Sequence, residues 1–332
     1  MKDDRTFPVQ APPEWGIQPV PPEHRPLRFL DLFVLWSSLG VGLLVLEAGA
    51  LLVPGLSLLH ALAAILVGTL VGNLLLALAG VAGSDHGLPT MVLLRAVLGQ
   101  RGSFLPSALN LIQLIGWTAF EFWAIALAAS RISETLFGFR GYGLWLIVFA
   151  VICTLLALGG PLVVVRQWLE KFGVWLVYGA TIWITISLFT QHDVLALLRQ
   201  AGTGELPFLL AVDLAVAMPV SWLPLVADFT RFAKKPRAAF GGTYLGYLLA
   251  NVWFYGLGAL FVLTLQLGEP TPENLATAIV ALTGGVAALL VILINETDNA
   301  FADIYSASVT LQNVLPRANQ RTLIVAIGVV SL

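Results

Sequence analysis

The chain has 332 residues, of which 58% are hydrophobic and 11% are charged, with a formal net charge of −2 and a mean hydropathy of +0.89. Soluble domains carry about 25% charged residues, so this composition excludes a soluble globular protein. Apolar runs of about 20 residues recur, as membrane-spanning helices require, whereas the short alternating segments of an outer-membrane barrel are absent. We therefore predict an all-α polytopic membrane protein.

The first segment, residues 1–27, is polar and rich in proline. Prolines favour an extended or flexible chain, and the segment lacks the apolar stretch of a cleaved secretory signal. These prolines are Pro8, Pro12, Pro13, Pro19, Pro21, Pro22 and Pro26. We predict that residues 1–27 form a cytoplasmic tail and that residues 28–332 form one transmembrane domain.

Apolar runs bounded by charges, glycine or proline predict eight complete spans and the start of a ninth. The predicted spans are 30–53, 56–81, 104–129, 144–165, 168–189, 209–232, 244–267, 276–308 and 322–332. Residues 276–308 are too many for one simple span, so we expect a short surface helix before the eighth span proper.

The basic residues predict the orientation of these spans. With the amino terminus inside, 14 of the 17 Lys and Arg residues lie on the cytoplasmic side, and only Arg131, Arg140 and Arg199 lie on the other. Cytoplasmic loops of membrane proteins are enriched in Lys and Arg. The sequence therefore predicts a multi-pass protein of the cell (inner) membrane with a cytoplasmic amino terminus.

Two predicted spans contain helix-breaking residues near their middle. The first span has Ser37, Ser38, Gly40 and Gly42 in succession, and the sixth has two prolines, at 219 and 224. Each proline removes a backbone donor from its helix. Breaks in the first and sixth spans match a transporter built from two inverted five-helix repeats, with its site at the breaks. The alternative is a pair of kinked packing helices, since glycine and proline are common in membrane helices.

The last apolar run, residues 323–332, is only about half the length of a span. We expect from this that the sequence is a fragment or that its last helix is incomplete, which would truncate the second repeat. Weak or absent transport by the 332-residue chain is the corresponding expectation.

Polar residues recur at helical spacing on one face of the third predicted span and on one face of the eighth. An acid at the centre of a membrane helix costs about 2.5 to 3.5 kcal/mol, so these faces should meet protein or water rather than lipid. The alternative for the amides is hydrogen bonding between packed helices. The two sets are Asn110, Gln113, Trp117 and Glu121, and Glu296, Asn299, Asp303 and Ser306.

The sequence contains no H-E-x-x-H, G-x-S-x-G or phosphate-loop pattern, so the common membrane hydrolases and ATP-driven pumps are disfavoured. We expect a transport protein and not an enzyme. The polar faces and the two breaks together predict a solute or ion site.

Three segments resemble the nucleobase:cation symport family 1. Residues 87–102 with Gly116 and Trp117 resemble that family's approach to its third helix, and Ser221–Trp222 with residues 228–232 resemble its sixth. Residues 296–306 are similar to the eighth helix of the hydroxymethylpyrimidine permease branch, and this segment is the most specific of the three.

The resemblance implies a LeuT-like fold of inverted five-helix repeats, alternating access, and transport of a planar heterocycle coupled to Na+ or H+. In such a site Trp117 and Trp222 would stack on the ring, while Glu121 and Asp303 would bind its polar edges. The substrate-binding residues implied in this way are Trp117, Glu121, Trp222, Ser221, Gly42, Asp303 and Glu296. The cation-binding residues are Ser38, Val41, Thr297 and Asp298.

Where the family has amides, this chain has the acids Glu121 and Asp303. A carboxylate accepts hydrogen bonds and can pair bidentately with an aminopyrimidine edge, where the exocyclic amine is a donor and a ring nitrogen is a proton acceptor. The sequence therefore favours cytosine or a thiamine precursor such as hydroxymethylpyrimidine over uracil. Besides this substrate and the lipid bilayer, we expect no nucleic-acid partner and no cofactor other than the coupling ion. An amine or amino-acid carrier of the same architecture and a non-transporting membrane scaffold are the alternatives.

Overall fold

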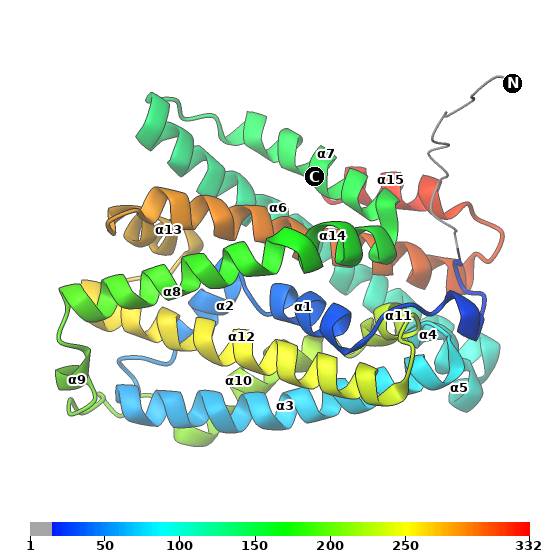
Figure 1. Ribbon diagram of the computed structural model, residues 1–332, viewed down its shortest axis with the longest axis horizontal. Coiled ribbons are helices and arrows are strands. Elements are labelled where there is room, and N and C mark those ends of the chain that lie inside the picture. Colours follow the sequence, from blue (N-terminus) through cyan, green and yellow to red (C-terminus); the bar gives the residue numbers. More distant parts are fainter. Residues whose placement is uncertain (1–14) are drawn as a thin grey trace, which may run out of the picture.

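The computed structural model describes residues 15–332, apart from the side chains of residues 166–168 and 170 (Figure 1). The regular elements of this range are helices. Their bounds are η1 (Pro22–His24), α1 (Phe29–Leu39), α2 (Leu43–Ala50), α3 (Leu58–His86), α4 (Thr90–Leu93), α5 (Arg95–Gly102), α6 (Phe104–Phe137), α7 (Tyr142–Val163), η2 (Val164–Gly173), α8 (Val174–Gln191), α9 (Val194–Leu197), α10 (Phe208–Ser221), α11 (Val226–Thr230), α12 (Pro236–Leu265), α13 (Pro272–Ala281), α14 (Gly285–Val314) and α15 (Gln320–Val330).

Within the described residues, six helices are long and apolar enough to cross a membrane, or seven if the bent pair α1–α2 counts as one span. The long helices lie side by side along one direction (Figure 1). The all-α prediction is thus confirmed. The predicted sixth and ninth spans correspond to α10 and α15, which are apolar but shorter than a full span.

The first span is broken where the sequence predicts it. The axes of α1 and α2 differ by 62°, and the break falls between Leu39 and Leu43. Gly42 caps α2 with an extended backbone, and a Cβ at this position would lie 2.6 Å from a carboxylate oxygen of Glu296. Small residues therefore allow the broken chain to approach α14 closely.

The predicted sixth span is interrupted as well. Its first part, α10, ends at Ser221, and the short α11 resumes at Val226, so Trp222 and Pro224 lie in the irregular segment between them. Pro219 lies in the last turn of α10 and packs against Gly72 of α3. A proline has no backbone N–H to donate to the preceding turn, so Pro219 weakens the last turn of α10 and Pro224 prevents the helix from continuing.

The region of the predicted eighth span forms two helices. They are α13 and α14, separated at Gly284, whose φ of +72° only glycine adopts readily. The short helix α13 exposes Glu273 and Asn274 and buries Leu275, Ala276 and Ile279 on the side that packs against α6 and α14. Its apolar face extends the protein core at this end.

The polar helix α14 lies in the interior of the bundle. In an apolar stretch of 18 residues of α14, 72% of the residues are buried, whereas the corresponding stretch of α7 has 22% buried. Its neighbours include α6, α7, α8 and α15. The helix that carries the most acids therefore faces protein, while α3 and α7 expose many large apolar side chains, as lipid contact requires.

The predicted tail divides into two parts. Residues 1–14 lie outside the described residues. Residues 15–27 pack on the domain: the N–H of Val20 donates to the carbonyl of Gly87 at 2.9 Å, and the guanidinium of Arg25 donates to the carbonyl of Ser84 at 2.8 Å. Leu27 pairs with Ala233 in an isolated bridge.

Candidate functional site

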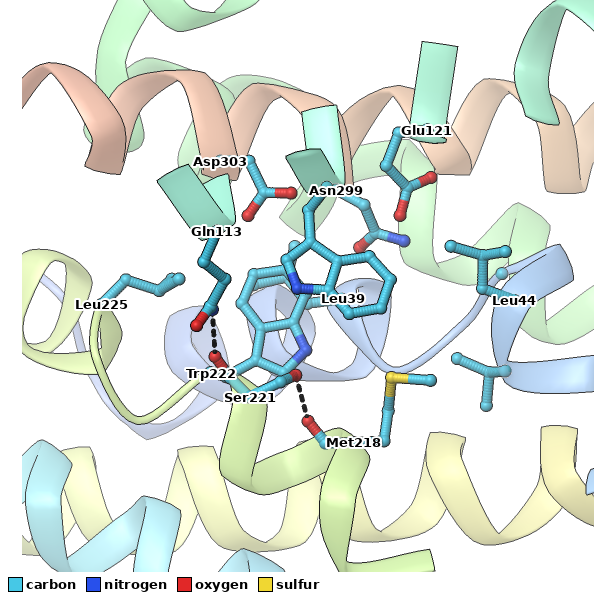
Figure 2. A pocket seen from close by; sticks show the side chains of 13 residues that line it. Leu39, Leu44, Gln113, Glu121, Met218, Ser221, Trp222, Leu225, Asn299 and Asp303 are labelled. Atoms are coloured by element: carbon cyan, nitrogen blue, oxygen red, sulfur yellow. Dashed lines mark hydrogen bonds between the residues drawn. The ribbon is translucent and has the colours of Figure 1, made fainter. Parts of the chain in front are cut away.

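A cavity with an empty volume of about 430 Å³ lies between the two broken spans and the helices α6 and α14 (Figure 2). Both breaks contribute to its wall, as predicted for a transporter with inverted repeats. The lining residues are Leu39, Gly42, Leu44, Val45, Gln113, Trp117, Glu121, Met218, Ser221, Trp222, Leu225, Asn299 and Asp303.

Two tryptophans from different helices face this cavity. Trp117 comes from α6 and is half-buried, and Trp222 comes from the break after α10 and is 8% exposed. Trp36 of α1 packs edge-on against Trp222, with ring centroids 6.1 Å apart. This contact holds the Trp222 indole at the cavity wall, where flat ligands can stack on it.

The opposite wall is rich in acceptor oxygens. In Figure 2, Glu121, Asn299 and Asp303 come from α6 and α14 and lie on the side of the cavity away from Met218. Glu121 Oε2 and Asn299 Oδ1 are buried without a hydrogen-bond partner. None of the lining residues is basic. Buried acceptors of this kind are satisfied by a ligand that donates hydrogen bonds.

Glu296 lies behind this wall rather than in it. Its Oε1 accepts from the N–H of Leu43, at 3.2 Å, in the first turn of α2. Its carboxyl group also interacts with that of Glu121. The structure thus places Glu296 between the broken first span and the cavity acid Glu121, where it supports the site from outside the cavity.

The predicted cation-binding residues lie where α14 crosses the first break. The hydroxyl of Ser38 lies 3.0 Å from Asp298 Oδ2 and 2.6 Å from Asn295 Oδ1. Thr297 turns its hydroxyl back to the carbonyl of Ile294 in its own helix, at 2.6 Å. The carbonyl of Val41 accepts from side-chain amides of α14. Ser38, Val41 and Asp298 are therefore brought together, whereas the Thr297 hydroxyl is engaged elsewhere.

Three amides at the site are absent from the sequence-based selection of binding residues. Asn299 and Gln113 line the cavity, and Asn295 binds the broken first span. The Nε2 of Gln113 donates to the carbonyl of Ser221 at 2.9 Å (Figure 2). The helical spacing of Gln113 with Glu121, and of Asn299 with Asp303, could have indicated that these amides face the site. The same spacing is also expected for amides that only form hydrogen bonds between packed helices.

The family model described as "Permease for cytosine/purines, uracil, thiamine, allantoin" matches residues 19–332. This chain belongs to that family. The resemblance inferred from the three sequence segments is thus confirmed at the level of the family, although the hydroxymethylpyrimidine branch stays a prediction. The family is one of permeases and not of enzymes, as expected.

The chain is similar to several curated relatives. It is 30% identical over 284 residues to "Putative purine-cytosine permease YxlA" of Bacillus subtilis (strain 168), covering 84% of this chain and 60% of the relative. It is 23% identical to the hydantoin permease of Microbacterium maritypicum, covering 89% and 65%, and 25% identical to the cytosine permease of Escherichia coli (strain K12), covering 85% and 64%. The chain thus spans less than two thirds of the length of these relatives.

The fold matches a solved transporter. Mhp1, a nucleobase-cation-symport-1 family transporter in a closed conformation with bromovinylhydantoin bound, superposes with a TM-score of 0.85 at 21% identity. The match covers 96% of this chain and 74% of Mhp1. An inward-facing conformation of Mhp1 gives a TM-score of 0.79. The LeuT-like fold implied by the family resemblance is therefore confirmed.

Proposed function

We propose that this protein is a secondary active transporter that imports a pyrimidine-type nucleobase or thiamine precursor, such as cytosine or hydroxymethylpyrimidine, by alternating access and symport with Na+ or H+. The observation that carries the proposal is the cavity between the two broken spans, which combines two indoles with acceptor oxygens and has no basic lining residue. The cytosine permease and hydantoin permease among its relatives support a heterocyclic substrate.

The indoles support a flat ligand. Trp117 and Trp222 approach the cavity from different helices, so a planar ring can lie against both. Stacking of a base on an aromatic side chain contributes about 1 to 3 kcal/mol and accepts any ring with a π face. The tryptophans would thus select heterocycles as a class without choosing among them.

The acids support an amino-substituted ring. The carboxylates of Glu121 and Asp303 can only accept hydrogen bonds when ionised, and both side chains line the cavity. The exocyclic amine of cytosine or hydroxymethylpyrimidine carries two N–H donors and can satisfy such acceptors. Uracil presents a carbonyl oxygen in place of this amine, and that oxygen would face a carboxylate oxygen at a cost.

The alternative of an amino-acid carrier is disfavoured by the same wall. An amino-acid substrate brings its own carboxylate, and no Lys, Arg or His lines the cavity to bind it. A simple amine would meet the acids without this conflict, and its ammonium group could also lie over an indole face. Competition by pyrimidines against amines and amino acids separates these candidates.

The location in the inner membrane and the cytoplasmic amino terminus remain predictions from the distribution of basic residues. Reporters fused to residue 1 test the orientation. We expect activity from a reporter that works only in the cytoplasm. Activity from a reporter that works only in the periplasm would contradict the predicted orientation.

Uptake of a radiolabelled aminopyrimidine by cells that express the protein tests the function. We expect saturable uptake that Trp117→Ala and Glu121→Gln reduce strongly at equal expression. Normal uptake by both variants would contradict the assignment of the cavity as the substrate site. Competition with unlabelled cytosine, uracil and leucine in the same assay ranks the substrate classes.

A further inference from the structure

The break in the first span leaves backbone carbonyls without helical partners, and side-chain amides of α14 donate hydrogen bonds to them. The Nδ2 of Asn295 donates to the carbonyl of Ser38 at 3.0 Å and to the carbonyl of Val41 at 3.3 Å. Asn295 is 2% exposed. Its orientation is determined by its surroundings, because only the amino end can face two carbonyls while the Ser38 hydroxyl lies 2.6 Å from its Oδ1.

These two carbonyls have no lone pair left for a metal ion. A carbonyl oxygen accepts two hydrogen bonds. That of Ser38 accepts from Asn295 and from the N–H of Val41, and that of Val41 accepts from Asn295 and from Asn299, at 3.3 Å each. A Na+ ion at the break would have to displace the Asn295 amide before it could bind either oxygen.

The surroundings supply few substitutes for those ligands. A small cavity beside Asn295 and Asp298 is otherwise lined by glycine and apolar side chains, namely Gly173, Leu176, Val177, Val291 and Ile294. Hard cations are bound by several oxygen ligands at once. Asp298 Oδ1 is buried and without a partner, whereas Asp298 Oδ2 and Asn295 Oδ1 contact the Ser38 hydroxyl at 3.0 Å and 2.6 Å, so only one oxygen of this acid is free of a protein contact. The residues implied for a sodium site therefore do not fit Na+ in this arrangement.

We propose that the Asn295 amide replaces a bound cation at the break of the first span, so that this protein holds α1 and α2 against α14 without Na+. Asn295 is a positioning residue in this proposal, because it acts through the backbone of Ser38 and Val41. The proposal rests on the proposed function in one respect, namely that it leaves H+ as the coupling cation of the symporter.

The first test measures thermal unfolding of the purified, ligand-free protein in detergent while NaCl replaces choline chloride at constant ionic strength. A ligand that binds the native state raises the unfolding temperature by mass action. We expect no difference between the NaCl and KCl curves as either salt replaces choline chloride. A rise in unfolding temperature that grows with Na+ and is absent with K+ in the wild-type protein would overturn the proposal.

The second test exchanges the amide for a carboxylate of the same shape. In Asn295→Asp a carboxylate oxygen replaces the Nδ2 that faces the carbonyls of Ser38 and Val41, so the break lacks its donors and gains a negative charge. We expect this variant to unfold at a lower temperature in choline chloride and to regain stability as Na+ is added. A loss of stability that Na+ does not restore would show a merely structural role and would contradict the proposal.

Asn73→Asp is the matched control for the second test. Asn73 is also fully buried, and its Nδ2 donates to the carbonyl of Thr69 within α3, at 2.9 Å. We expect the same loss of stability without any response to Na+. An equal Na+ response in both variants would mean that the effect is general, which would overturn the proposal.

The two proposals fail separately. The Na+ titrations use ligand-free protein, so their outcome does not depend on which substrate is bound. If Na+ does not change the stability of the wild-type protein and no pyrimidine stabilises it, the proposed function is wrong and the assignment of Asn295 stands. If both pyrimidines and Na+ stabilise the protein, the assignment of Asn295 is wrong and the proposed function stands.

Discussion

The side-chain amide of Gln113 on α6 donates to the carbonyl of Ser221 at 2.9 Å, at the point where α10 ends. This bond connects the third span to the break in the sixth. The Ser221 hydroxyl meanwhile donates to the carbonyl of Met218, at 2.7 Å, within α10. The geometry of the cavity around Trp222 therefore depends on an interaction between the two repeats.

Gln113→Leu should loosen this connection. The carbonyl of Ser221 would lose its donor, and an unsatisfied buried acceptor costs roughly 1 to 3 kcal/mol. We expect a lower unfolding temperature and weaker ligand binding. Gln113→Glu lacks the donor as well and should behave similarly, so wild-type stability in both variants would contradict this role.

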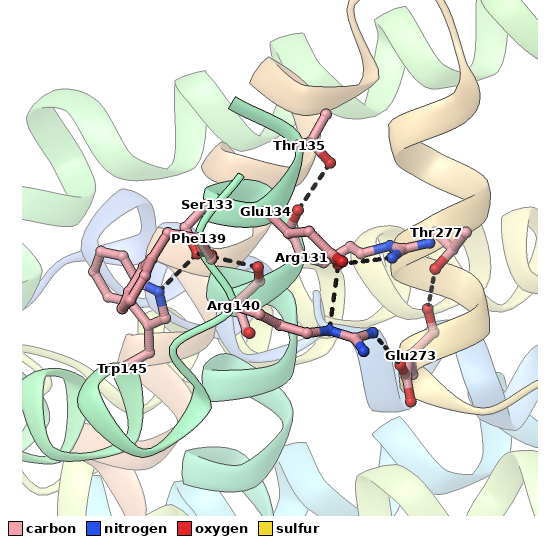
Figure 3. A network of polar contacts seen from close by, with 10 residues as sticks. Arg131, Ser133, Glu134, Thr135, Phe139, Arg140, Trp145, Glu273 and Thr277 are labelled. Atoms are coloured by element: carbon pink, nitrogen blue, oxygen red, sulfur yellow. Dashed lines mark hydrogen bonds and ion pairs between the residues drawn. The ribbon is translucent and has the colours of Figure 1, made fainter. Parts of the chain in front are cut away.

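The two cavity tryptophans should be needed for ligand affinity. Trp117→Ala and Trp222→Ala each remove one stacking surface, for a loss of about 1 to 3 kcal/mol, or roughly 5- to 150-fold in Kd. Trp145→Phe is the control, because Trp145 donates to Ser133 in a polar network at the α6–α7 connection, away from the cavity (Figure 3). Calorimetric titration with an aminopyrimidine measures the three Kd values, and equal losses in all of them would refute a specific role.

Glu121→Gln should change selectivity as well as affinity. The amide offers donors where the carboxylate offers only acceptors, so an aminopyrimidine should lose roughly 10- to 100-fold in affinity, from about 1.5 to 3 kcal/mol for a hydrogen bond to a charged group. Uracil, which presents carbonyl oxygens, should lose less or gain. The ratio of the two Kd values is the measurement, and an unchanged ratio would show that Glu121 does not read the ring edge.

Gly42→Ala should disturb the acid behind the cavity. The added Cβ would lie 2.6 Å from Glu296 Oε2, so the carboxylate must move away from the N–H of Leu43. The extended backbone of Gly42 accepts alanine, and we expect weaker binding with little loss of stability. Gly116→Ala is the control, because nothing lies within 4 Å of its Cβ position. Comparable Kd values for both variants would argue against this explanation.

Arg231 and Arg140 should differ in their effect on stability. Arg231 is fully buried and donates to the hydroxyl of Tyr305 at 2.7 Å and to the carbonyl of Gly16. Each such bond from a charged group contributes about 1.5 to 3 kcal/mol, so Arg231→Gln should be clearly destabilised. Arg140 lies at the surface, 3.4 Å from Glu134 and 3.7 Å from Glu273 (Figure 3), and its replacement should cost at most about 1 kcal/mol. Unfolding temperatures of both variants measure the difference, and a larger effect at Arg140 would contradict this ranking.

The spans and both breaks could be predicted because apolar length and the position of glycine and proline are local properties of the sequence. The surroundings of α13 could not, since its burial depends on how α6 and α14 pack. Helical spacing identified the polar faces of α6 and α14 but not which members reach the cavity. Asn299 does so, whereas Glu296 lies behind it.

The contact of Asn295 could not be predicted for a different reason. The sequence places it beside Glu296 and Thr297, but its role depends on the rotation of α14 about its axis and on carbonyls freed by a break more than 250 residues earlier. Such pairings follow from tertiary packing alone. The residues implied by the resemblance, Ser38 and Asp298, nevertheless pointed to the correct crossing of α1 and α14.

Thermal stabilisation of the purified protein by a panel of ligands tests the central claim most directly, because a compound that binds the native state raises its unfolding temperature, and a tighter or more concentrated ligand raises it further. We expect a concentration-dependent rise with cytosine and hydroxymethylpyrimidine, a smaller one with uracil, none with leucine, and loss of the rise in Trp222→Ala. Stabilisation by leucine alone, or an undiminished rise in Trp222→Ala, would contradict it.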